Sequence, residues 1–149
     1  MNCSFLVRIG FLVAILWFPA TWAMDKNSPE HYLDGSITPA HAHAGDTVVI
    51  RWIIDSDKSC VGIVQRKLVD AGGVVYDFLP KGTDTKAGER QVELTREIIL
   101  PLGMAPGRAT YHAEFSWMCN PFQRLFWPLL AQTPELYFTI DPSPTLIPH

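Results

Sequence analysis

Two cysteines carry the clearest chemical signal in this chain of 149 residues. A third, Cys3, falls in the N-terminal leader described below, so the body of the chain keeps Cys60 and Cys119. In an oxidising compartment an even pair of cysteines is typical of a disulfide rather than of a nucleophile. The sequence contains no phosphate-cradling glycine loop, no His-Glu-x-x-His motif and no Gly-x-Ser-x-Gly elbow. It therefore predicts a structural cross-link, no cofactor and no enzymatic activity.

Three histidines offer a different chemistry. His41 and His43 are two residues apart, so an extended backbone places both rings on one face, and His31 lies upstream. Imidazole nitrogens bind transition metals such as copper and zinc. The alternative interpretation is an ordinary strand that leads into a turn at Gly45-Asp46. A metal site at the three histidines is therefore kept as the minor alternative.

An apolar segment, residues 120–130, follows Cys119. Loops usually run over the surface and are polar, yet this one holds six large apolar side chains. If exposed, it has the composition of a contact for a protein partner. The alternatives are that it folds back and caps one end of the domain, or that it inserts into a membrane surface. The predicted partner-binding residues are Phe122, Arg124, Leu125, Phe126 and Trp127.

The charge balance disfavours nucleic acid as a partner. The formal net charge is −3, and removal of Arg8 with the leader takes it to −4, because the leader holds no acidic residue. Contacts to nucleic-acid phosphates need clustered lysines and arginines, and no basic stripe is visible. We therefore expect no nucleic-acid binding.

The first 23 residues have the pattern of a signal peptide. A short basic region ends at Arg8, an apolar stretch follows, and Pro19 precedes a small-residue exit at Ala23. The alternative is an uncleaved anchor in the inner membrane, although a spanning helix needs roughly 20 apolar residues and this stretch is shorter. Either interpretation places the rest of the chain outside the cytoplasm, in the periplasm or secreted.

The rest of the chain is expected to form one β domain. Alternating apolar side chains predict strands near residues 48–54, 74–78, 92–100, 108–118 and 136–140, and a β-branched run covers 60–69. The predicted organisation is a flexible segment over 24–35, a domain over 36–141 and a disordered tail over 142–149. About seven short strands with frequent turns and no amphipathic helix favour an all-β, single Greek-key sandwich.

The domain resembles immunoglobulin-like and fibronectin-III-like sandwiches of exported, including phage-associated, bacterial proteins. The resemblance covers residues 36–141 and depends on the turn before the Trp52 strand and on Pro106-Gly107 followed by Tyr111. This tyrosine resembles the tyrosine corner, whose hydroxyl binds nearby backbone. Cys119 lies too far after it for the usual inter-sheet disulfide. On such a strand order, the resemblance implies that the disulfide joins two antiparallel neighbours of one sheet at one end of the sandwich.

These observations predict a non-catalytic, exported binding or accessory module of the cell envelope that contacts a protein partner through residues 120–130. The alternatives are a periplasmic metal-binding protein and a membrane-anchored structural or phage-associated envelope component.

Overall fold

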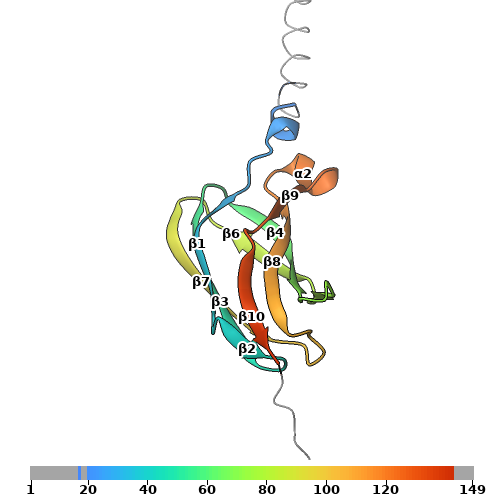
Figure 1. Ribbon diagram of the computed structural model, residues 1–149. Coiled ribbons are helices and arrows are strands. Elements are labelled where there is room, and N and C mark those ends of the chain that lie inside the picture. Colours follow the sequence, from blue (N-terminus) through green and yellow to red (C-terminus); the bar gives the residue numbers. More distant parts are fainter. Residues whose placement is uncertain (1–16, 18–19, 143–149) are drawn as a thin grey trace, which may run out of the picture.

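The computed structural model describes residues 17 and 20–142, in which ten strands form two sheets (Figure 1). The three-stranded sheet has the order β1-β3-β7, with β1 at Glu30–Thr38, β3 at Thr47–Ser56 and β7 at Glu89–Ile99. The larger sheet has the order β2-β10-β8-β4-β5, with β6 beside β4 and β9 beside β8. Its strands are β2 (His41–His43), β4 (Cys60–Val69), β5 (Val75–Asp77), β6 (Lys81–Thr85), β8 (Gly107–Met118), β9 (Leu129–Gln132) and β10 (Leu136–Asp141).

The prediction of a mostly-β chain is confirmed, but its finer features are not. The described residues hold ten strands instead of about seven, and the larger sheet is mixed because β2 pairs parallel to β10 while the other pairs are antiparallel. The Greek-key connectivity stays a prediction.

Helices make up little of the described chain. Residues 20–24 are helical, and α2 spans Pro121–Leu125. Within the described residues, no helix has the length and apolar character needed to cross a membrane. Most of the predicted leader and the tail over 143–149 lie outside the described residues, so the leader and the domain boundaries stay predictions.

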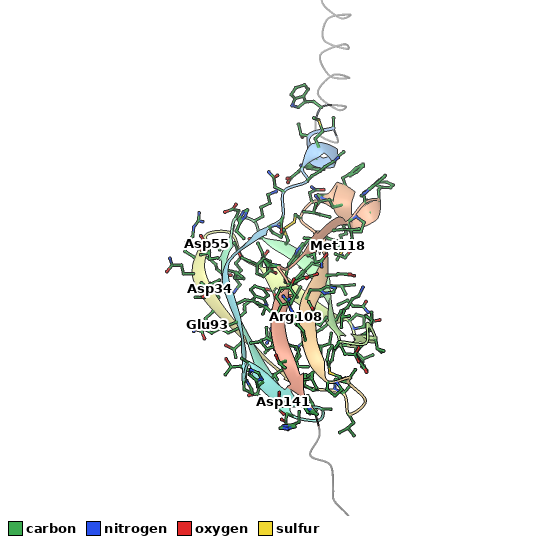
Figure 2. All side chains as sticks on the ribbon, viewed as in Figure 1. Asp34, Asp55, Glu93, Arg108, Met118 and Asp141 are labelled. Carbon is green, nitrogen blue, oxygen red and sulfur yellow. A yellow bond between two sulfur atoms is a disulfide. The ribbon has the colours of Figure 1, made fainter. Side chains whose placement is uncertain are left out.

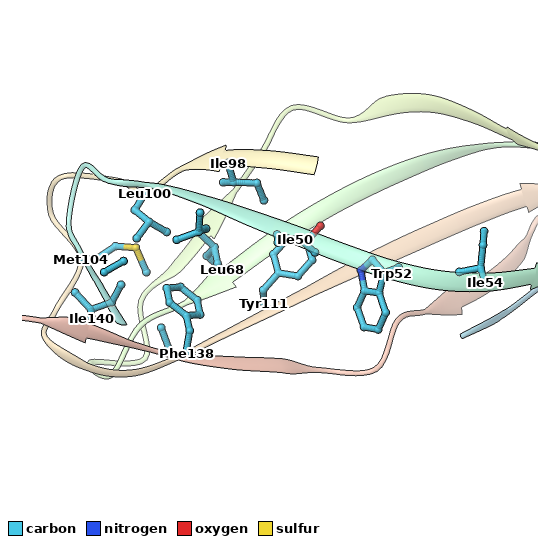
Figure 3. Close-up of a cluster of buried hydrophobic side chains, with 13 residues drawn as sticks. Ile50, Trp52, Ile54, Leu68, Ile98, Leu100, Met104, Tyr111, Phe138 and Ile140 are labelled. Atoms are coloured by element: carbon cyan, nitrogen blue, oxygen red, sulfur yellow. The ribbon is translucent and has the colours of Figure 1, made fainter. Parts of the chain in front are cut away.

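The core fills the space between the two sheets because apolar side chains alternate along β3. Val48, Ile50, Trp52 and Ile54 are buried on one face of this strand and meet Tyr111 and its neighbours from the opposite sheet (Figure 3). The larger sheet contributes Leu68, Ala109, Tyr111, Phe138 and Ile140. Burial of one large aliphatic side chain contributes roughly 1.5–3 kcal/mol. This alternation therefore fixes which face of β3 turns inward.

Trp52 needs the absence of a side chain on the neighbouring strand. Its ring lies against Gly35 of β1, where a Cβ would come within 2.1 Å of the ring carbon Cζ3. The indole is thereby held within the core, where it also contacts the ring of Tyr32 edge-on at 5.0 Å between centroids. Gly35 thus positions one wall of the site described next.

Two strands lie where the sequence has no apolar alternation. β1 begins at Glu30, within the segment 24–35 that was expected to be flexible. β6 occupies part of the hydrophilic stretch 80–89 that was expected to be a loop. Both are short or largely polar strands that pair with a longer neighbour, β3 and β4 respectively. The backbone hydrogen bonds of the neighbour stabilise them, and such pairing leaves no local pattern in the sequence.

Candidate functional site

A cavity of about 70 Å³, here called the inter-sheet cleft, lies between the two sheets. Both sheets supply its walls. The three-stranded sheet contributes Trp52, Leu94 and Arg96, with Glu30 and Tyr32 from β1, and the larger sheet contributes Arg66, Lys81, Tyr111 and Phe115. Charged and aromatic side chains therefore line a space that the regular packing of two sheets would otherwise close.

Arg96 reaches the cleft because it takes an inward position on β7. It pairs with Ile50 of β3, and the same face of β7 carries Leu94 and Ile98. An arginine thus interrupts an apolar row that faces the opposite sheet. Its side chain is exposed at the cleft and has no carboxylate partner among the described residues.

Arg66 approaches from the other sheet. It lies on β4 opposite Ala113 of β8, and its guanidinium carbon is 5.8 Å from the centre of the Phe78 ring. Its Nε is buried and has no hydrogen-bond partner among the described residues. Lys81, at the start of β6, likewise has no ion pair with a described carboxylate. Three cationic side chains therefore line the cleft without a counter-ion from the described part of the chain.

Tyr111 lies within electrostatic reach of both arginines. Burial raises the pKa of its hydroxyl to about 12, and the positive charges of Arg66 and Arg96 oppose that rise. Within the described part of the chain, this hydroxyl has no hydrogen-bond partner. The expected tyrosine corner is therefore wrong: the hydroxyl does not bind nearby backbone, because the ring belongs to the buried core and its end is directed to the cleft.

The other end of the cleft is acidic. Glu30 is only 6% exposed, and its Oε2 accepts a hydrogen bond from the hydroxyl of Tyr32 at 2.5 Å. Burial raises the pKa of Glu30, and the hydrogen bond from Tyr32 opposes the rise. Burial together with the charge of Glu30 also raises the pKa of Tyr32. The ring of Tyr32 contacts Trp52 and lies 6.5 Å from Phe115, so an aromatic wall joins the two ends.

The chain keeps most of its acidic side chains away from this cleft. Asp34, Asp55 and Glu93 lie along the outer side of the three-stranded sheet (Figure 2). Two of them are paired there, Asp55 with Arg90 and Glu93 with Arg51. The protein has a net negative charge, but the lining of its cleft has a net positive charge, because cationic side chains outnumber carboxylates there.

The predicted disulfide is present. Cys60 and Cys119 are joined with an S–S distance of 2.04 Å. Cys60 opens β4 and Cys119 follows the end of β8, which is its antiparallel neighbour in the larger sheet. The bond therefore joins two adjacent strands of one sheet at one end of the domain, where the strand order placed it.

The predicted partner-binding residues are mostly exposed. Asn120 caps α2 by accepting a hydrogen bond from the backbone N–H of Gln123, and the chain then turns outward. The exposed fractions of Leu125, Phe126 and Trp127 are 72%, 71% and 75%, so this segment does not cap the core. Arg124 is exposed and Phe122 is half-buried. Phe122 and Trp127 also border an open groove of about 630 Å³ beside residues 22–26.

The three histidines do not assemble. Each lies beside a different carboxylate: His31 beside Asp57 at 2.6 Å, His41 beside Asp141 at 3.3 Å and His43 beside Asp46 at 3.5 Å. Within the described residues, no three side chains of the histidine, cysteine, aspartate or glutamate type are grouped so that they could hold a metal ion. The three histidines therefore do not form a common cluster in the described structure, and the metal-binding alternative stays a prediction.

Sequence reasoning missed the cleft. The one available signal was Arg96, the single polar residue on the apolar face of its strand. Arg66 lies in a run with blurred alternation, and Glu30 lies in a polar segment without periodicity. Neither segment has a local pattern from which the inward orientation of Arg66 or Glu30 could have been predicted.

Comparison with known proteins gives a fold and no family. No family model matches the chain, and no curated protein matches it. A solved structure of the Pseudomonas fluorescens alkylpurine DNA glycosylase AlkC, bound to DNA containing an abasic site analog, is similar with a TM-score of 0.53 and 16% identity. That match covers 78% of this chain and 31% of the glycosylase chain. The sporulation control protein Spo0M of Bacillus subtilis matches with a TM-score of 0.46 and 7% identity, over 78% of this chain and 51% of that chain. The chain thus spans about a third of the length of the glycosylase chain and about half of the length of the Spo0M chain.

These comparisons correct several predictions. The resemblance to immunoglobulin-like and fibronectin-III-like envelope domains is wrong, because the similar structure with a TM-score above 0.5 is a DNA glycosylase. The prediction of an envelope module with a protein partner, and its anchored or phage-associated alternative, is contradicted by the same likeness to the glycosylase. The predicted location outside the cytoplasm is not tested by this likeness and stays a prediction. The exclusion of nucleic acid as a partner is also contradicted, because that glycosylase is described bound to DNA. At 16% identity, the likeness shows the fold alone.

Proposed function

We propose that this protein is a non-catalytic module that binds an oxyanion, a phosphate or carboxylate group, in the inter-sheet cleft. One observation carries the proposal: Arg66 and Arg96 come from opposite sheets, line the same cleft as Tyr111, and have no carboxylate partner among the described residues. Guanidinium groups bind carboxylates and phosphates through paired N–H donors. A bound oxyanion would accept from both arginines and from Tyr111.

The electrostatics of the cleft support this proposal. Two like charges held near each other without a counter-ion repel, and a partly buried cation loses hydration. An anion bound between the two arginines reduces their repulsion and replaces the lost hydration. The cleft is therefore more stable with an anion bound than without one. The cavity volume of about 70 Å³ suits an anionic end group or a narrow ligand, since pockets for drug-sized ligands have roughly 300–1,000 Å³.

The glycosylase adds one candidate source of the anion. Its structure is described bound to DNA, and a DNA phosphate is an oxyanion. Binding along a DNA backbone needs several basic contacts, whereas this chain has net charge −3 and three unpaired cations in one cleft. We therefore propose that the cleft recognises one oxyanion group at a time, and a DNA phosphate is one such group.

Arg96→Gln is expected to weaken oxyanion binding by roughly tenfold to a hundredfold, because a hydrogen bond to a charged group contributes about 1.5–3 kcal/mol. Titration calorimetry with inorganic phosphate, with acetate and with a 5′-phosphorylated oligonucleotide measures the effect and separates the sources. Arg124→Gln is the matched control, since Arg124 is exposed on α2 and remote from the cleft lining. Absence of binding to all three ligands, or equal losses in the two variants, would count against the proposal.

We also propose that the protein works outside the cytoplasm, in the periplasm or beyond the cell. The leader pattern over residues 1–23 and the Cys60–Cys119 disulfide support this location. Alkylation of thiols in protein taken directly from cells should leave both cysteines unmodified until a reductant is added. Two reactive thiols in the untreated protein would speak against an oxidising location.

A further inference from the structure

The inter-sheet cleft has a cationic end and an acidic end. Glu30 of β1 pairs with Ser56 of β3, whereas Arg96 of β7 pairs with Ile50 of the same strand. At about 3.3 Å per residue, these two positions on β3 lie roughly 20 Å apart along the strand. The long side chains of Glu30 and Arg96 shorten that separation, and both line one continuous cavity.

The charges that shift the pKa values of Glu30 and Tyr111 agree with this separation of an acidic end from a cationic end. The pKa of Glu30 responds to burial and to Tyr32, while Arg66 and Arg96 act on Tyr111 instead. Among the described residues no ion pair joins Glu30 to Arg66 or Arg96, so Glu30 is not the counter-ion of either arginine. The groups that face the cleft around it are Tyr32 on its own strand, Arg96 on β7, Arg66 on β4, Lys81 on β6 and Tyr111 on β8.

Glu30 also keeps an open acceptor. Its Oε2 is engaged by Tyr32, but its Oε1 has no partner among the described residues and is not among the fully buried, unsatisfied atoms. A carboxylate that is 94% buried (6% exposed) is costly when unpaired. A positively charged group of a ligand would supply the missing partner.

The walls between the two ends are apolar. Trp52 and Leu94 face the cleft from one sheet, and Val64 and Phe115 face it from the other. A chain of methylene groups can fill this part without burying an unsatisfied polar atom. The small volume excludes a branched or bulky linker.

From this arrangement we infer that the ligand is a linear zwitterion of the ω-amino acid type, with its carboxylate at Arg66 and Arg96 and its ammonium group at Glu30. This inference rests on the proposed function, because it uses the same cationic end to hold the anion. It adds a second point of recognition, which gives the ligand a direction and a length.

A ligand series tests the inference in the wild-type protein without any substitution. Titration calorimetry compares straight-chain ω-amino acids of increasing length with the straight-chain carboxylates of equal length that lack the amine. At one length, the amino acid should bind at least tenfold more tightly than its matched carboxylate. Equal binding at every length would overturn the inference while leaving the oxyanion site intact, whereas failure of both series to bind would remove the proposed function as well.

Glu30→Gln locates the amine. This variant should abolish the preference for the amino acid over the matched carboxylate, because Gln preserves the shape and removes the charge. Glu97→Gln is the control, since Glu97 is exposed on β7 beside Arg96 and does not line the cleft. A preference that survives in Glu30→Gln would overturn the assignment of the ammonium to this carboxylate.

Discussion

Trp117→Ala is expected to lower the free energy of unfolding by about 3–5 kcal/mol, the usual cost of removing a large buried aromatic side chain. Trp117 on β8 is fully buried, and its ring stacks on Phe115 with 5.2 Å between the centroids and 3° between the planes. The neighbouring strand β4 accommodates the Trp117 ring only because its residue 62, which pairs with Trp117, is glycine. A Cβ at that position would lie 2.6 Å from a carbon of the ring. Truncation would leave a cavity that the surrounding strands cannot close.

Trp127→Ala is the matched control for this prediction. Trp127 is 75% exposed, so its truncation should change stability by no more than about 0.5 kcal/mol. Urea unfolding followed by far-ultraviolet circular dichroism measures both variants without depending on tryptophan fluorescence. Similar losses for the two variants would mean that the segment containing Trp127 packs against the domain and is not exposed.

Removal of the disulfide, by Cys60→Ser with Cys119→Ser, should lower the free energy of unfolding by about 4 kcal/mol. The bond closes a loop with a sequence separation of 59, and closure of a loop of this length restricts the unfolded chain by about that amount. Denaturant unfolding of the oxidised wild type and of the double variant measures the difference.

Reduction of the wild-type protein is the control for the disulfide prediction. It should reproduce the loss seen in the double variant, because it opens the same loop without changing a side chain. If reduction leaves the stability unchanged while the variant is destabilised, the effect comes from poor packing of serine at position 60, which is 4% exposed, and not from the cross-link.

Local pattern accounts for the parts of the fold that the sequence predicted. The alternation of Val48, Ile50, Trp52 and Ile54 reports one buried face, and the period of two is a property of a single strand. β1 and β6 were not predicted, because their pairing with β3 and β4 comes from partner strands distant in sequence. The composition of residues 120–130 could not distinguish capping from exposure, since an apolar side chain fits either role until its neighbours are known.

Local features of the sequence were sufficient to predict the mostly-β class, the long strands and the pairing of Cys60 with Cys119. Each of these depends on alternation within one strand or on a count of two cysteines. The packing of the chain in three dimensions was needed to establish that Trp117 is buried and Trp127 exposed, and that Arg66 and Arg96 line one cleft with Tyr111. Those two arginines belong to different sheets, so their proximity depends on how the sheets pack, and no local pattern in the chain records it.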